Sequence, residues 1–166
     1  MRHALALAAL IGLSACGLQP MYAGGGSASV AQGLAAVDVP AIPGQSGWLV
    51  RNALRNRLGV AGSAKPAYRL DVRLDDSLEA LGVLNDDTIS RERRILRARY
   101  QLVDIATGAI LLDATAGSDA GIDVVSSEYA TIAAEQKALE NLALELAGQM
   151  ATQVSLALRS RAEAAR

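Results

Sequence analysis

Hydrophobic residues recur along this chain with two different periods, and the change of period predicts where helices and strands lie. Over residues 47–58 the apolar positions follow the 3.6-residue spacing of an amphipathic helix. Ser46 is suited to cap the start of that helix, and Gly59 is suited to end it. A second, longer helix is expected to begin after Ser126 or Ser127. Its predicted buried stripe comprises Ile132, Leu139, Leu142, Ala143, Leu146, Met150, Val154 and Leu158.

Three segments between these helices alternate apolar and polar residues, which is typical of half-buried strands. They run from Tyr68 to about Leu84, from about Thr88 to Asp104, and from Ile110 towards Asp123. Turn residues separate them at 85–87 and 106–108. A shorter strand is expected at about residues 35–39, where Pro40 stops it.

The order of these elements is strand, helix, strand, strand, strand, helix. A strand–helix–strand unit favours a parallel pair with a right-handed crossover, and the two later turns favour antiparallel hairpins. We therefore predict an α+β, two-layer sandwich with two helices packed on one face of a mixed four-stranded sheet (order β-α-β-β-β-α). The other face of the sheet is then polar and rich in arginine.

The N-terminus has the features of a secretory signal peptide over residues 1–15. A basic start and a short apolar segment precede Leu13-Ser14-Ala15-Cys16, and the apolar segment is shorter than the about 20 residues that cross a bilayer. This ending resembles the lipobox of bacterial lipoproteins, in which the cysteine is acylated after cleavage. The resemblance predicts lipidation at Cys16, and Gly17 behind it indicates the periplasmic face of the outer membrane. The alternative is a secreted protein whose signal happens to contain Cys16.

Residues 16–33, rich in glycine, serine and alanine, are expected to form the lipidated N-terminus and a flexible tether, ahead of a single domain over 34–166. Cleavage would remove His3, the only histidine, and acylation would occupy Cys16, the only cysteine. Metal sites built from histidine or cysteine, catalytic triads and thiol nucleophiles are thereby excluded. Loss of Arg2 leaves 15 basic residues (16 in the full chain) against 17 acidic ones, which gives no support for nucleic acid as a partner.

The segment from Arg91 to Arg99 is the most distinctive feature inside the domain, because it carries five arginines and one glutamate. At period two, four of the arginines project from one side, and two arginines of the adjacent strand extend that surface. Guanidinium groups can hold phosphate in a two-pronged geometry, so the row could bind the phosphorylated head of a glycolipid. A solvated face, or an edge strand blunted by charge, is the other interpretation. The candidates for contact with such a glycolipid, or with a partner protein, are Arg69, Arg73, Arg91, Arg93, Arg97 and Arg99.

Three segments resemble the lipopolysaccharide-assembly lipoproteins of the LptE family, in its alphaproteobacterial form. The residues from Cys16 to Tyr22 are similar to the Cys-Gly-Phe-x-Pro-Leu-Tyr start of that family, with Leu18 and Met21 as departures. Residues 51–58 resemble its first helix, and 129–138 resemble the beginning of its last helix.

The resemblance implies an α/β sandwich that plugs the outer-membrane β-barrel LptD. Together they form the translocon that inserts lipopolysaccharide into the outer leaflet. It further implies help in barrel assembly, binding of lipopolysaccharide, an acyl anchor in the inner leaflet of the outer membrane, and neither an enzymatic activity nor a cofactor. By this resemblance the protein is lipid-anchored on the periplasmic side.

Other classes of function stay open at this stage. One is an auxiliary lipoprotein of an ABC-type lipid transporter, and another is a lipoprotein activator of a cell-wall synthase. A hydrolase that uses carboxylates alone is a third. Trp48, near the start of the first helix, is either a partner-binding residue or, more commonly for a lone tryptophan, core or boundary packing.

Overall fold

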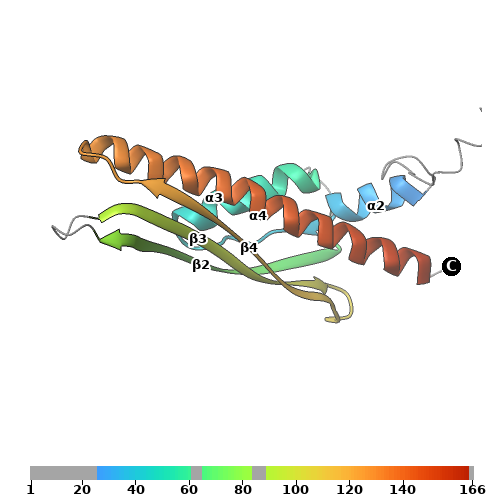
Figure 1. Cartoon of the computed structure of the whole chain (residues 1–166). Helices are drawn as coiled ribbons and strands as arrows, with labels where there is room; N and C mark the ends of the chain where they lie inside the picture. Colours follow the sequence, from blue (N-terminus) through green and yellow to red (C-terminus); the bar gives the residue numbers. More distant parts are fainter. Residues whose placement is uncertain (1–25, 61–64, 84–88, 165–166) are drawn as a thin grey trace, which may run out of the picture.

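The computed structural model describes residues 26–60, 65–83 and 89–164, which form one layer of helices on one layer of sheet (Figure 1). The strands are β1 (Val37–Asp38), β2 (Tyr68–Val83), β3 (Ile89–Asp104) and β4 (Ile110–Asp123). The helices are α2 (Gly26–Ala35), α3 (Gly44–Leu58) and α4 (Glu128–Ala164). The strands are ordered β1-β2-β3-β4, with β1 parallel to β2 and the other two pairs antiparallel. The predicted α+β sandwich is confirmed, as is the predicted element order from β1 to α4.

The sheet is a long ribbon because β2 and β3 pair in one continuous register. The pairing runs from Tyr68 opposite Asp104 to Val83 opposite Ile89. Strands of 16 residues span roughly 50 Å, about three times the common strand length. The strict alternation fixes which side chains share a face, since a slip of one residue would exchange the two faces.

Helix α3 begins earlier than the hydrophobic pattern predicts. Its start is at Gly44, directly after Pro43, so Ser46 lies inside the helix and is not its cap. The φ of Pro43 is −67°, close to the helical value, and this ring pre-organises the chain for the first turn. The predicted end is confirmed: Gly59 adopts a left-handed φ of +66°, and its N–H donates to the carbonyl of Asn56.

Helix α4 begins one residue after Ser127, whose Oγ accepts a hydrogen bond from the N–H of Ala130. The predicted buried stripe is confirmed except at its first position, because Ile132 is 48% exposed. Thr131 is buried in its place, and its hydroxyl donates to the carbonyl of Val125. At its start, α4 therefore buries Thr131 and not Ile132, so the buried side of its first turn does not line up with the buried stripe further along the helix.

Helix α2 was not expected, since residues 16–33 were predicted to form a flexible tether. Residues 26–33 of that segment are helical, and the helix lies beside the C-terminal half of α4 (Figure 1). A Cβ placed on Gly33 would lie 3.5 Å from Cδ1 of Leu158, which shows how close the two helices approach. Packing therefore overrides the low helix propensity of this glycine- and serine-containing segment. The strand expected over residues 35–39 is reduced to the two residues of β1.

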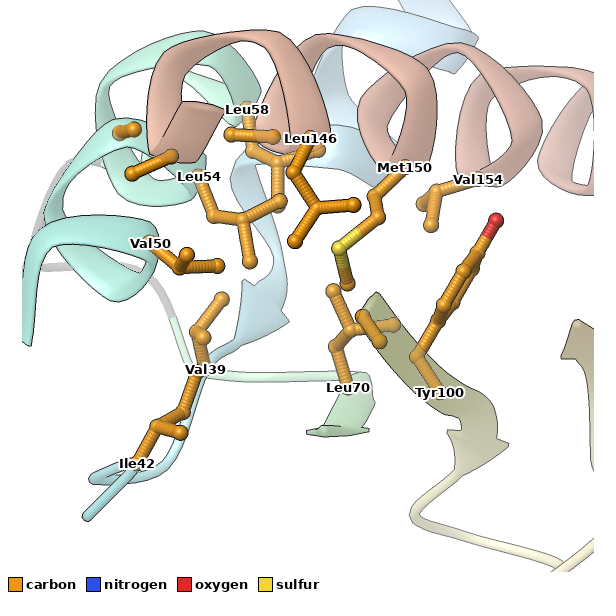
Figure 2. Packing of buried hydrophobic residues seen from close by; sticks show 14 of the residues in the cluster. Val39, Ile42, Val50, Leu54, Leu58, Leu70, Tyr100, Leu146, Met150 and Val154 are labelled. Carbon is orange, nitrogen blue, oxygen red and sulfur yellow. The ribbon is translucent and has the colours of Figure 1, made fainter. Parts of the chain in front are cut away.

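The hydrophobic core fills the space between the helices and the inner face of the sheet (Figure 2). Leu54 and Val50 of α3 pack with Met150 of α4 over Leu70 of β2. Tyr100 of β3 is the largest fully buried side chain. The core is otherwise aliphatic, as expected from a chain with no phenylalanine.

Candidate functional site

The face of the sheet that no helix covers carries the predicted row of arginines. Arg91, Arg93, Arg97 and Arg99 alternate along β3 with residues of the buried inner face, such as Leu96 and Ala98. Arg69 and Arg73 project from β2 on the same side. The predicted grouping of these six side chains on one polar face is therefore what the register produces. We call this surface the outer face.

Carboxylates of β4 neutralise three arginines of β3. Nε of Arg91 lies 3.0 Å from Oδ1 of Asp123. Nε of Arg93 lies 3.0 Å from Oδ2 of Asp119. The third pair joins Nη2 of Arg99 to Oδ2 of Asp113 at 3.2 Å.

These ion pairs shift the pKa of the carboxyl groups in the expected direction. The hydrogen bond from Arg99 lowers the pKa of Asp113, and the side-chain amide of Gln101, 2.8 Å away, lowers it further. The hydrogen bond from Arg93 lowers the pKa of Asp119 in the same way. Both carboxylates are accordingly held ionised, and their partners are occupied.

The outer face as a whole is balanced rather than basic. Its six arginines face six carboxylates, namely Asp71, Asp75, Glu79, Asp113, Asp119 and Asp123. Arg69 bonds Asp71 of its own strand at 2.9 Å. The excess of arginine that the sequence of β3 shows by itself is thus compensated by the strands on either side. Net charge on this face no longer argues for a phosphate ligand, and any such ligand depends on individual arginines.

Two arginines of the outer face are distinct from the others. Among the residues that the structure describes, no carboxylate lies within 4.0 Å of Arg73 or Arg97. Together with Arg99 they border a shallow depression of about 540 Å³, whose lining also includes Asp75, Thr115 and Gly117. Because Gly117 has no side chain, the floor is low beside Arg97. A phosphate or carboxylate would meet the guanidinium donors of Arg73 and Arg97 here, and also the carboxylate of Asp75 opposite Arg97.

The fifth arginine of the run, Arg94, lies on the inner face and has a structural role. Its Nε and Nη2 both donate to the carboxylate of Asp76 at 2.9 Å, and its Nη1 donates to the carbonyl of Glu135 in α4 at 3.4 Å. The two charged side chains are only 18% and 22% exposed. The pair therefore links the far part of the sheet to the first turns of the long helix.

Two aromatic side chains are exposed on the helices. Trp48, for which packing was the commoner expectation, is 63% exposed in the second turn of α3. Tyr129 is 85% exposed at the start of α4.

The sequence did not predict a cleft between β4 and α4, because the cleft depends on how two segments distant in sequence approach each other. The only sequence signal for it is the run of small residues in β4.

Further features of the chain concern metal binding, membrane spanning, Cys16 and the turn at residues 85–87. In the described part of the chain, no group of three or more His, Cys, Asp or Glu side chains could hold a metal ion. No helix within the described ranges is both long and apolar enough to cross a membrane. Cys16 lies outside the described residues, as does the turn at 85–87.

The fold and the polar sheet face define a small α+β domain, in which one face of the sheet is packed under helices and the other is open. Residues 34–154 match the family model described as "LptE: Lipopolysaccharide-assembly". The chain therefore belongs to the LptE family of lipopolysaccharide-assembly lipoproteins, whose role is not enzymatic. The resemblance seen in the sequence is confirmed.

Solved structures agree with this assignment. The chain is similar to a putative lipoprotein from Caulobacter crescentus CB15, with a TM-score of 0.68 and 26% identity, over 79% of this chain and 96% of that one. It shares the fold of rare lipoprotein B from Shewanella oneidensis, with a TM-score of 0.55, 10% identity, and coverage of 76% and 96%. A minor lipoprotein from Acinetobacter baumannii has a TM-score of 0.54, 16% identity, and coverage of 72% and 88%. No curated protein sequence matches this chain.

Proposed function

We propose that this protein is the lipoprotein plug of a lipopolysaccharide translocon. It binds an LptD-like outer-membrane β-barrel, assists its assembly, and takes part in inserting lipopolysaccharide into the outer leaflet. The family match over residues 34–154 is the observation that carries the proposal. A compact insert with one balanced, polar sheet face suits the aqueous lumen of a barrel. Its exposed Trp48 is the kind of side chain that is enriched where partners meet.

Lipidation of Cys16 is part of this proposal. Three acyl chains would hold the protein firmly in the inner leaflet of the outer membrane, since each buried methylene contributes about 0.8 kcal/mol. The ten Cα-to-Cα steps from Cys16 to Gly26 can span at most about 35 Å. The domain is then confined to the periplasmic side close to the membrane, within reach of a barrel lumen.

Co-purification tests the partner. The tagged full-length chain, extracted from envelopes in mild detergent, is expected to retain one heat-modifiable outer-membrane barrel in roughly one-to-one ratio. Recovery of only an ABC permease would instead favour a transporter accessory. Recovery of only a glycosyltransferase would favour an activator of a cell-wall synthase.

The ion pairing on the outer face sharpens the test of glycolipid contact. Arg73→Ser with Arg97→Ser removes the two outer-face arginines for which no described carboxylate lies within 4.0 Å. The matched control is Arg91→Ser with Arg93→Ser, which removes two arginines already paired with Asp123 and Asp119. We expect the first double variant to lose most lipopolysaccharide binding and the control to retain it. If both double variants bind lipopolysaccharide equally, the role of this face is either solvation or barrel contact. Capture of the barrel, measured separately for each variant, decides between these two roles.

A further inference from the structure

β4 forms one edge of the sheet, and its far side is open. The sheet ends at β4, and no other described strand pairs with it on that side. The side-chain amide of Gln149 donates to the carbonyl of Gly117 at 3.4 Å, which shows that this carbonyl faces away from β3. Since backbone groups alternate between the two sides of a strand, those of Thr115 and Asp119 face the same open side. The described residues supply no other hydrogen bond there.

The composition of this edge does not protect it. Long open edges are usually blocked by proline, by lysine or by a bulge. Over residues 114–121, β4 instead consists of alanine, glycine, serine and threonine, with Asp119 as its single charge. Asp119 is already paired with Arg93. Glycine within a strand commonly marks the close approach of another backbone, and Gly117 and Gly121 both lie on the outer face.

Arg97 lies beside this edge. Cγ of Arg97 is 3.4 Å from the position that a Cβ would take on Gly117, so the arginine side chain packs against the bare backbone of β4. No described carboxylate lies within 4.0 Å of its guanidinium. A carboxylate on a strand added beyond β4, opposite Gly117, would therefore meet a donor that is not otherwise used.

The helix side of the same edge is polar, and it includes one carboxylate, since Glu145 of α4 accepts a hydrogen bond from Oγ of Ser118 at 2.7 Å. A cleft of about 440 Å³ lies between β4 and α4, and side chains without charge surround it. Its floor includes Tyr100, whose hydroxyl is buried and has no hydrogen-bond partner among the described residues. Figure 2 shows this hydroxyl pointing from β3 towards α4. The remaining lining residues are Thr115, Ala116, Gly148, Gln149, Thr152 and Gln153.

We propose that the open edge of β4 takes up an extended segment of a partner polypeptide as a fifth strand. Backbone hydrogen bonds to Thr115, Gly117 and Asp119 hold the segment, and its bond to the carbonyl of Gly117 replaces the one from the side-chain amide of Gln149. A carboxylate on its outer side pairs with Arg97, and a neutral polar side chain on its inner side enters the cleft beside Gln149. The proposal is independent of the translocon assignment, because it specifies the chemistry of the segment and not the protein that supplies it.

A peptide with the required pattern tests the proposal on the full-length chain in detergent. The probe is the blocked heptapeptide Thr-Val-Gln-Glu-Gln-Val-Thr, and amide hydrogen exchange is followed by NMR. We expect the amides of Thr115, Gly117 and Asp119 to exchange more slowly as the probe is added. Arg97→Gln should weaken binding about fivefold, the loss of a partly exposed ion pair, whereas the matched control Arg73→Gln should not. Replacing the glutamate of the probe by glutamine should have the effect of Arg97→Gln.

Blocking the backbone gives a second, independent result. The N–H of Thr115 faces the open side, so Thr115→Pro removes an edge donor without removing a hydrogen bond to β3. Binding should be lost while circular dichroism stays unchanged. The proposal is overturned if edge amides are not slowed at millimolar probe, or if Arg97→Gln and Arg73→Gln bind alike. Dimerisation of the chain that Thr115→Pro abolishes would assign the edge to a second copy and also overturn it.

Discussion

Two glycines in helices α3 and α4 are expected to respond to the same substitution with opposite sign. A Cβ on Gly47 would lie 2.5 Å from the carbonyl oxygen of Ile42 and 2.7 Å from its carbon. Both are backbone atoms that cannot rotate away, so Ala at this position forces the start of α3 off the preceding segment. A Cβ on Gly148 would lie 3.3 Å from Cζ of Arg57, which is the mobile end of an exposed side chain.

The magnitudes follow from two opposing contributions. Replacing glycine by alanine inside a helix favours folding by about 1 kcal/mol. Overpacking against fixed atoms costs about 1–3 kcal/mol, and the overlap at Gly47 belongs at the upper end of this range. We therefore expect Gly47→Ala to lower the free energy of unfolding by about 2 kcal/mol. Gly148→Ala should raise it by up to about 1 kcal/mol, because the guanidinium of Arg57 can move.

Thermal unfolding of the full-length chain in detergent, followed by circular dichroism, measures both effects. At about 3 °C per kcal/mol, Gly47→Ala should melt roughly 6 °C lower, and Gly148→Ala roughly 3 °C higher. A melting temperature of Gly47→Ala at or above that of the unsubstituted protein would contradict the packing of α3 against Ile42. Reversed signs for the two variants would refute the reasoning altogether.

Three further changes test the ion pairs and the core. Asp76→Ala leaves Arg94 without its carboxylate partner beneath α4 and should lower the free energy of unfolding by about 2 kcal/mol. Asp123→Ala, which breaks an exposed ion pair, should change it by less than about 0.5 kcal/mol, and urea titration distinguishes the two variants. Because the folded-state pKa of Asp113 and Asp119 is lowered, their stabilisation is present above about pH 4 and is lost as the pH falls through the folded pKa. Arg99→Gln should raise the pKa of Asp113 but not that of Asp119 in an NMR titration, and a shift of both would contradict the pairing. Tyr100→Phe removes a buried hydroxyl that has no hydrogen-bond partner in the described part of the chain, so the free energy of unfolding should stay unchanged or rise by about 1 kcal/mol. A clear loss of stability would reveal an unrecognised hydrogen bond.

The fold was predictable because the spacing of hydrophobic residues and the positions of turn-forming residues indicate the same elements along most of the chain. The end of α3 at Gly59 and the extents of the three long strands follow from residues close in sequence. Helix α2 could not be predicted in this way, since its stability comes from contact with Leu158, more than 120 residues away. The start of α3 was misplaced because Pro43-Gly44 has the composition of a turn as well as of a helix start.

The candidate site was predictable only in part. Alternation correctly placed four arginines of β3 on one face and Arg94 on the other. Their neutralisation depends on the register with β2 and β4, which brings carboxylates opposite them across the sheet. The same register leaves Arg97 beside Gly117, and no local pattern of residues could show which arginines keep a free guanidinium.

We have proposed that this member of the LptE family is lipid-anchored and binds a barrel for lipopolysaccharide export. Native mass spectrometry of the complex, released from outer-membrane vesicles in detergent, tests it most directly. The expected result is one copy of this chain with one large barrel protein, the chain beginning at Cys16 and carrying the mass of three acyl chains and glycerol. An unmodified chain free in the periplasmic fluid, with no barrel bound to it, would contradict the account.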